Sequence, residues 1–218
     1  MIQFDHVTKG FWVRRAFQTV IDDLTFTLPT GRALALLGRN GAGKSTLLEL
    51  ISGTMQPDRG TVWSNGSISW PVGLGGSFHR DLTGAQNTRF LARVYGVDTD
   101  ELADFVQDFA DIGKHFHMPF RTYSQGMRSR LTFGISMGIP FDTYLIDEIT
   151  AVGDAQFRRK SQAVFRDRMK SASAIMVSHN LAELREFCDS AILLHRGKLT
   201  FYDSLDEAIA QHETRMAQ

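Results

Sequence analysis

The sequence predicts an α/β fold, in which a P-loop-type core with a mostly parallel sheet carries an N-terminal antiparallel β part and an α-helical insertion. Three features of the chain lead to this prediction. Short apolar segments of strand type alternate with helical segments, which is typical of a parallel sheet with helices on both faces. A glycine-rich loop joins one such strand to a helix. Between residues 78 and 140 the apolar residues recur with helical period, so we expect an inserted helical subdomain.

The chain is long enough for one large domain. Its 218 residues include 43% hydrophobic residues, which suffice for a buried core. We therefore predict a single domain over residues 1–218, with the helical subdomain at 78–140 and no appended carbohydrate-binding domain.

Two short strands begin the chain. Residues 2–7 form the first, and residues 24–28 form the second, in which apolar residues alternate with threonines. That alternation has the period of a half-buried sheet. Between the strands lies an aromatic and basic stretch, residues 10–15, which we predict to form a turn.

The phosphate-binding candidate follows an apolar strand at residues 33–37. It matches the pattern G-x-x-x-x-G-K-[ST] from Gly38 to Ser45, and helical residues follow it. Glycines let the backbone N–H groups turn inward around an anion, and the next helix adds its positive N-terminal end. We expect Lys44 to reach the β- and γ-phosphates of ATP and the Ser45 hydroxyl to ligate Mg²⁺. The predicted nucleotide-binding residues of this loop are Gly38, Asn40, Gly41, Ala42, Gly43, Lys44, Ser45 and Thr46.

Turn and cap residues divide the next part of the chain. Gly53 is placed to end the first helix, and Asn65-Gly66 predicts a hairpin after a strand at residues 61–63. Thr83 with Gln86 forms a capping-box pattern at the start of a helix. The apolar face of that helix is expected to consist of Phe90, Leu91, Val94 and Tyr95.

The α/β pattern resumes after residue 140. A strand at 144–146 runs into Asp147 and Glu148, and a helix is expected at 155–169. A buried strand at 174–177 ends at His179. A hairpin of residues 191–194 and 199–202 then leads to a last helix, residues 205–216.

Composition excludes several functional classes. Lys plus Arg and Asp plus Glu number 24 each, so the zero net charge gives no overall field for holding nucleic acid. The single cysteine, Cys188, excludes an intramolecular disulfide and a Cys-based zinc cluster. No segment approaches the ~18–20 apolar residues of a membrane helix, and residues 1–5 show no secretory signal. We expect no nucleic-acid partner, and membrane contact only through another protein.

Four further motifs identify a family resemblance. Residues 123–127, Tyr-Ser-Gln-Gly-Met, resemble the signature loop of ABC-type ATPases. The strand ending in Asp147-Glu148 resembles the Walker B motif, residues 151–154 resemble the D-loop, and His179 is similar to the switch histidine. With the phosphate loop, five motifs stand in the family's order over nearly the whole chain.

The resemblance implies a role for each matched residue. It implies that Asp147 binds Mg²⁺ and that Glu148 acts as general base on the attacking water. His179 would contact the γ-phosphate. Lys44 completes the catalytic set. Ser124 and Gly126 would meet the ATP held by the other protomer of a homodimer.

Three other positions follow from the same resemblance. Asp154 would lie at the dimer seam. Phe11 aligns with the aromatic residue that stacks on adenine, with Trp12 as its rival. His79 stands where many members have a glutamine that contacts Mg²⁺, and whether this histidine takes part in metal or partner contact is left open.

One stretch narrows the resemblance to a subclass. Residues 70–74, Trp-Pro-Val-Gly-Leu, together with the other motifs look like the ATPase subunit of capsular polysaccharide exporters. Such a subunit binds ATP and Mg²⁺, pairs with a polytopic membrane permease and lies peripherally at the cytoplasmic face of the inner membrane. The alternatives are an exporter of O-antigen or teichoic acid, and a soluble regulatory or DNA-linked ABC ATPase.

Overall fold

The computed structural model describes residues 1–71, 78–147 and 154–216. The chain forms two compact units, which are described separately. The first unit comprises Met1–Pro71, Phe141–Glu148 and Ser171–Gln218, and the second comprises Val72–Pro140 and Ile149–Lys170. The second unit thus contains residues 78–140, for which the helical insertion was predicted, and also residues 149–170, which the prediction did not include.

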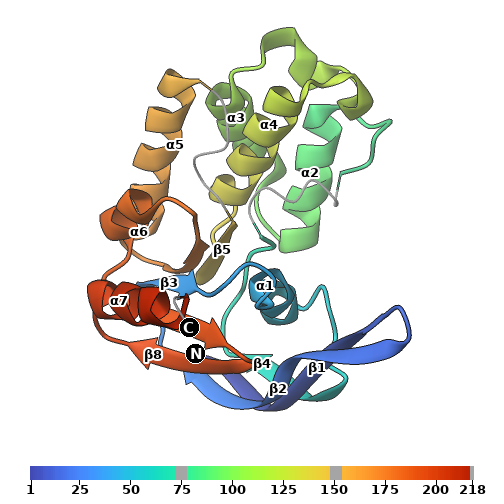
Figure 1. The fold of residues 1–218 in the computed structure, drawn as a ribbon. Coiled ribbons are helices and arrows are strands. Elements are labelled where there is room, and N and C mark those ends of the chain that lie inside the picture. Colours follow the sequence, from blue (N-terminus) through green and yellow to red (C-terminus); the bar gives the residue numbers. More distant parts are fainter. Residues whose placement is uncertain (72–77, 148–153, 217–218) are drawn as a thin grey trace. The chain divides into compact units, whose positions relative to one another are not determined.

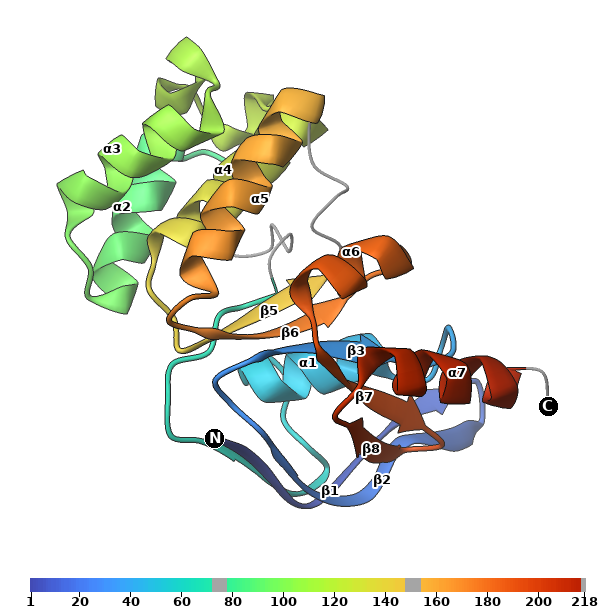
Figure 2. The ribbon, with the colours of Figure 1, turned by 90° about the vertical axis from the view of Figure 1, so that its left-hand side faces the viewer.

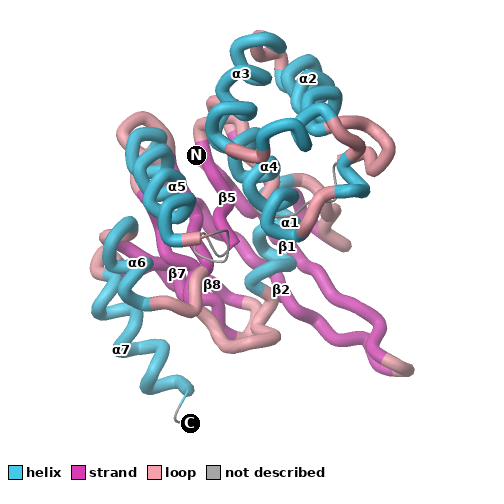
Figure 3. Tube along the Cα trace, turned by 90° about the horizontal axis from the view of Figure 1, so that it is seen from above, coloured by secondary structure: helices cyan, strands magenta, loops and turns pink. Residues whose placement is uncertain are grey.

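An antiparallel sheet of three strands begins the first unit. Its order is β2 (Ala16–Leu28), β1 (Ile2–Val13) and β4 (Arg59–Ser64). The tip of the β1–β2 hairpin projects past the first helix, α1 (Lys44–Ser52; Figures 1 and 3). Buried side chains recur along β1 and β2, although the register shifts between Phe4 and Gly10, so these strands present one buried face.

The second sheet of this unit has the order β5-β6-β3-β7-β8 and is parallel except for its last strand. Its strands are β3 (Ala33–Leu37), β5 (Thr143–Asp147), β6 (Ser173–Val177), β7 (Ser190–His195) and β8 (Lys198–Tyr202). Helix α6 (Leu181–Phe187) follows β6, and α7 (Leu205–Met216) lies alongside β7 and β8 (Figure 2). The α/β fold with a mostly parallel sheet and an antiparallel β part is therefore confirmed.

Both sheets and α1 share one core. Leu47, Leu48 and Ile51 of α1 are buried in a single cluster with inward side chains of both sheets. Gly53 ends α1 in the left-handed conformation, as predicted, with φ of 74°. The core therefore fixes the start of α1 at the end of β3, where the phosphate loop lies.

The second unit is helical. Helices α2 (Gly84–Tyr95), α3 (Thr99–Ala110), α4 (Gln125–Gly138) and α5 (Ala155–Arg168) pack in series (Figure 1). Two short 3-10 turns, η2 (Gly113–His117) and η3 (Phe120–Thr122), connect α3 to α4. Phe109 lies at the centre, with its ring 5.7 Å from Phe133 and 5.2 Å from Phe157.

The predicted capping box at the start of α2 is present. Thr83 Oγ1 accepts from the Gln86 amide at 3.1 Å, and Gln86 Oε1 accepts from the Thr83 amide at 2.9 Å. Each bond satisfies an N–H group that the helix leaves without an internal partner.

Replacing Thr83 with Ala should lower the free energy of unfolding by about 1 kcal/mol, the usual worth of such a cap. The midpoint of urea unfolding measures the loss. Thr99→Ala is the control, because Thr99 follows the Asp98 cap and its hydroxyl makes no hydrogen bond within the described residues. Equal midpoints for Thr83→Ala and the wild type would show that the box does not stabilise the unit.

The predicted turn at residues 10–15 is wrong. Residues 11–13 continue β1, and Trp12 and Val13 pair with Phe17 and Ala16. Only Arg14 and Arg15 form the turn, with Arg14 in the left-handed region at φ of 57°. Aromatic and β-branched residues favour strand, and here they extend the hairpin to its tip.

The predicted hairpin at Asn65-Gly66 is also wrong. After β4 the chain continues to Ile68, which bridges Thr143 in parallel. The Asp142 carboxylate holds this course by accepting from the Ser67 amide at 2.7 Å and the Ser67 hydroxyl at 2.8 Å. The following residues Ser69 and Trp70 are buried. Tertiary hydrogen bonds thus override a local turn signal.

The apolar face predicted for α2 is only partly buried. Leu91 is buried, but Phe90, Val94 and Tyr95 are exposed. The buried side includes Asn87 instead, whose amide donates to the carbonyls of His79, Leu82 and Thr83. A polar contact with the preceding loop therefore sets which side of α2 faces the unit's interior.

Candidate functional site

The phosphate loop lies between the end of β3 and the start of α1. Gly41 and Gly43 have φ of 79° and 100°, a backbone conformation that other residues adopt only with strain. A Cβ on Gly43 would also collide with the Val20 side chain of β2. The loop thus needs glycine at position 43 for two reasons, backbone conformation and space.

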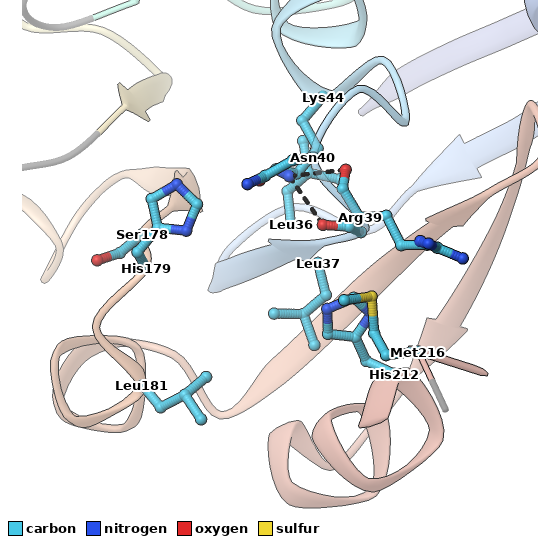
Figure 4. A pocket seen from close by; sticks show the side chains of 11 residues that line it. Leu36, Leu37, Arg39, Asn40, Lys44, Ser178, His179, Leu181, His212 and Met216 are labelled. Atoms are coloured by element: carbon cyan, nitrogen blue, oxygen red, sulfur yellow. Dashed lines mark hydrogen bonds between the residues drawn. The ribbon is translucent and has the colours of Figure 1, made fainter. Parts of the chain in front are cut away.

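Lys44 lies folded over this loop. Its Nζ donates to the carbonyls of Gly38 at 2.8 Å and Arg39 at 3.2 Å (Figure 4). Burial lowers the pKa of Lys44, while the negative charge of Asp147 acts in the opposite direction. An ammonium group held by two carbonyls at the mouth of the loop is placed for a multiply charged anion.

A cavity of about 460 Å³ opens beside the loop. Its walls bring together residues that are far apart in sequence, from both sheets of the first unit. The lining residues are Phe11, Val20, Asn40, Gly41, Gly43, Lys44, Ser45, Thr46, Asp147, Val177 and His179. Most of the nucleotide-binding residues predicted from the sequence therefore share one cavity.

The base-stacking candidates lie on opposite faces of β1. Phe11 lines the cavity and is 37% exposed, with Lys9 Nζ 5.7 Å from its ring centre. Trp12 is 73% exposed, is absent from the cavity lining and packs edge-on against Phe17 at 5.5 Å. The geometry favours Phe11 for contact with an adenine ring.

Replacing Phe11 with Ala should weaken ATP binding by about tenfold or more, because stacking of a base on an aromatic ring is worth ~1–3 kcal/mol. Trp12→Ala should leave the affinity near that of the wild type. Isothermal titration with a non-hydrolysable ATP analogue measures both. A larger loss for Trp12→Ala would assign the stacking to Trp12 instead.

Asp147 and His179 come from neighbouring parallel strands. Asp147 ends β5 and pairs with Val177 at the end of β6, and His179 lies two residues beyond that strand. The turn after β6 is fixed locally, since Ser178 Oγ donates to Glu183 at 2.7 Å and accepts from the Asn180 amide at 3.0 Å. The carboxyl edge of the sheet thus carries both predicted side chains. Glu148 lies outside the described residues.

The donor set fits Mg²⁺ bound together with phosphates. Ser45 offers a hydroxyl and Asp147 a carboxylate on the same cavity, and oxygen donors are what Mg²⁺ prefers. Within residues 1–71, 78–147 and 154–216 no group of three His, Cys, Asp or Glu side chains is placed to hold a metal alone. The cavity therefore suits an ion that takes its remaining ligands from phosphate and water.

A second cavity, of about 450 Å³, reaches Lys44 and His179 from the side of α7 (Figure 4). His212 and Met216 of α7 line it, although no sequence pattern indicates that the last helix approaches the loop. Burial and the charge of Lys44 lower the pKa of His212. Sequence motifs indicate neither His212 nor Val20 as a neighbour of the phosphate loop, and only the folded structure shows both.

The remaining predicted site residues are helix caps in the second unit. Ser124 begins α4 and its side chain accepts from the Met127 amide at 3.3 Å, with Gly126 in the first turn. Asp154 begins α5, accepts from the Phe157 amide at 2.9 Å and forms an ion pair with Arg130 at 2.8 Å. The Phe157 amide and Arg130 lower the pKa of Asp154. The roles of Ser124, Gly126 and Asp154 toward a nucleotide remain predictions.

His79 is engaged within its own loop. Its Nδ1 accepts from the Asp81 amide at 3.3 Å, and its backbone amide donates to Asn87 at 2.9 Å. A ring whose Nδ1 accepts a backbone N–H keeps only Nε2 for other contacts. The structure thus gives His79 a local role in shaping the loop before α2.

The chain resembles known proteins over its whole length. The family model described as "ABC transporter" matches residues 21–151. The polysialic acid transport ATP-binding protein KpsT of Escherichia coli is 45% identical over 216 residues, which cover 98% of this chain and 96% of that protein. The capsule polysaccharide export ATP-binding protein CtrD of Neisseria meningitidis serogroup B is 40% identical over 208 residues, covering 95% and 96%.

Solved structures share the fold. The ATP-binding subunit of an ABC transporter matches with a TM-score of 0.81 and 23% identity, covering 98% of this chain and 99% of that one. A dimeric ATP-binding cassette bound to ADP and phosphate matches with a TM-score of 0.76 and 17% identity, covering 91% and 96%.

Proposed function

We propose that this chain, which belongs to the ABC transporter family of ATP-binding proteins, hydrolyses ATP to drive export of a capsular polysaccharide. The observation that carries this proposal is the near-complete coverage of the chain by ATP-binding proteins of polysaccharide export, at 40–47% identity. The cavity beside the phosphate loop supplies the chemistry that such a subunit needs.

ATP binding uses residues of the phosphate loop and of the cavity wall. Phe11 stacks on the adenine ring, and the amides of the loop from Gly38 to Thr46 surround the phosphates. Lys44 exchanges its carbonyl partners for β- and γ-phosphate oxygens. Ser45 and Asp147 would hold Mg²⁺, which would neutralise charge on the phosphates.

Hydrolysis then requires an ordered water. Glu148 accepts a proton from that water as its oxygen attacks the γ-phosphorus, and the bond to the β-phosphate oxygen breaks. His179 contacts the γ-phosphate from the carboxyl edge of the sheet. The products are ADP and inorganic phosphate.

A second copy of the chain completes the site. Ser124 and Gly126 begin a helix whose positive end suits the γ-phosphate held by the other protomer, and Asp154 lies at the same seam. The dimeric cassette among the similar structures supports this arrangement. An isolated monomer is then nearly inactive.

The transport step needs a polytopic permease. No helix within the described residues is both long and apolar enough to cross a bilayer. In this proposal the segment from residue 77 to residue 93 presses on the cytoplasmic part of the permease, and the ATPase lies peripherally at the cytoplasmic face of the inner membrane.

Deleting the gene and measuring surface polysaccharide tests the export role. Loss of the capsule, restored by the wild-type gene and not by a Lys44→Ala copy, is the expected result. An unchanged capsule would remove the export assignment and leave the ATPase standing.

A related cargo is the main alternative. An O-antigen export ATP-binding protein of Klebsiella pneumoniae is 34% identical and covers 100% of this chain, a smaller identity than that of the capsule proteins. Loss of O-antigen with an intact capsule in the deletion strain would favour this cargo.

A further inference from the structure

A third cavity of the first unit lies on the other side of the phosphate loop. Its volume is about 460 Å³, and residues 39–42 of the loop form one of its walls. The remaining walls come from the β7–β8 turn and from α7, with Leu194 as the apolar part. The loop thus separates two cavities of similar size.

Three arginines converge on this third cavity from three different elements. Arg39 belongs to the phosphate loop, Arg196 to the β7–β8 turn and Arg215 to the last turn of α7. In Figure 4 the Arg39 side chain extends away from Lys44 and His179. We name this set, with His195, the arginine cluster.

The arginine cluster holds uncompensated positive charge. None of its arginines forms an ion pair or a side-chain hydrogen bond within residues 1–71, 78–147 and 154–216; Arg215 is half-buried, and Arg39 and Arg196 are exposed. Burial lowers the pKa of His195, and the charges of Arg215, Arg196 and Arg39 lower it further. Positive groups that converge on one cavity repel one another, and an anion bound among them lowers that repulsion.

The β7–β8 turn, which carries Arg196, has a defined backbone conformation. Arg196 adopts the left-handed conformation, with φ of 48°, followed by Gly197 at 74°. The Gly197 carbonyl accepts from the Asp22 amide at 3.3 Å, which ties the turn to β2. A two-residue turn between the paired residues His195 and Lys198 requires this conformation, and it places Arg196 at the tip of the hairpin beside the cavity.

From this geometry we infer that Arg39, Arg196 and Arg215 form a second anion site, which binds a phosphate group carrying two or more negative charges. Guanidinium forks match phosphate oxygens in pairs, and three of them suit a doubly charged group better than a single carboxylate. The phosphate can belong to a small free anion or to a lipid headgroup. None of these arginines lines the cavity assigned to ATP, and the two cavities share only Asn40 and Gly41 of the loop.

Occupancy of this site reaches the nucleotide through Arg39. The Arg39 carbonyl accepts from Lys44 Nζ at 3.2 Å and from the Ala42 amide at 3.0 Å, while its side chain belongs to the arginine cluster. An anion that fixes the Arg39 side chain therefore also fixes the peptide that holds Lys44. The expected consequence is a change in affinity for ATP when the anion is present.

Titration with pyrophosphate at saturating non-hydrolysable ATP analogue tests the inference, because the analogue blocks the phosphate loop. Calorimetry should detect pyrophosphate binding to the wild type. Arg196→Gln and Arg215→Gln should each weaken it by about tenfold or more, since hydrogen bonds to charged groups are strong. Arg32→Gln is the matched control, because Arg32 is an exposed arginine of the same unit that pairs with Asp203.

Vesicles containing phosphatidic acid form the second arm and identify the source of the phosphate. Pyrophosphate binding without vesicle binding indicates a free anion, and vesicle binding alone indicates a headgroup; either one supports the site if Arg196→Gln and Arg215→Gln weaken it. Binding of neither probe, or an equal loss in Arg32→Gln, overturns the inference. Binding of the ATP analogue is measured in the same samples, so a failure of the proposed ATPase is seen separately.

Discussion

Replacing Lys44 with Ala is expected to lower ATP turnover by about 10²–10³-fold, the usual cost of removing one preorganised group that stabilises transition-state charge. In the structure this ammonium is held over the phosphate loop by the Gly38 and Arg39 carbonyls. No other cation on the wall of the main cavity can take its place, because the only other basic group there among the described residues is His179. Release of inorganic phosphate measures the turnover.

Lys198→Ala is the control for this prediction. Lys198 is exposed on β8 in the same unit, and its Nζ donates to the Asp23 carbonyl at 3.2 Å. It should leave turnover unchanged. A Lys44→Ala protein that hydrolyses ATP at the wild-type rate would contradict the placement of phosphate in this loop.

Replacing Glu148 with Gln should lower turnover by about 10²–10⁴-fold, the range that a positioned general base contributes. Glutamine has nearly the same shape but accepts no proton, so ATP binding should survive. If each nucleotide is held between two protomers, the unreacted complex should accumulate as a dimer. Light scattering after gel filtration in the presence of ATP and Mg²⁺ would detect it.

The matched control is Glu207→Gln, on the first turn of α7 and away from the cavities of the loop. It should hydrolyse ATP normally and form no persistent dimer. Wild-type turnover in Glu148→Gln would assign the proton transfer to another group. Lost turnover without a trapped dimer would instead count against a nucleotide shared between copies.

The parts of the molecule that sequence predicts well are those determined by local chemistry. The loop from Gly38 to Ser45 needs glycines, because its backbone adopts positive φ angles, and it needs a helix directly after it. Both requirements can be recognised in consecutive residues of the sequence. The Thr83–Gln86 capping box is likewise local. In each case the interacting atoms are only a few positions apart.

Predictions failed where distant residues decide the conformation. Asn65-Gly66 predicts a hairpin, but the amide of the next residue, Ser67, donates to the Asp142 carboxylate. Ile68 then forms a parallel bridge with Thr143. On α2, the polar Asn87 is buried while Phe90 is exposed, since the amide of Asn87 bonds three carbonyls of the preceding loop. Hydrophobic periodicity cannot detect such partners.

The same limit applies to the candidate site. Sequence motifs identified Lys44 and Ser45 at the start of α1 and Asp147 at the end of β5, because each belongs to a recognisable pattern of consecutive residues. Val20 and His212 belong to no pattern and enter the cavities only through the packing of β2 and α7. Their proximity is a property of the folded chain.

The β1–β2 hairpin contributes two side chains to the wall of the main cavity. Phe11 of β1 lines this cavity, and Val20 of β2 lies so close to Gly43 that it leaves no room for a side chain there. The antiparallel sheet thus contributes Phe11 and Val20 to the cavity, whereas Asp147 and His179 lie at the end of the parallel strands. Nucleobase choice and hydrolytic rate should accordingly respond to different substitutions, so that either can change during evolution without the other.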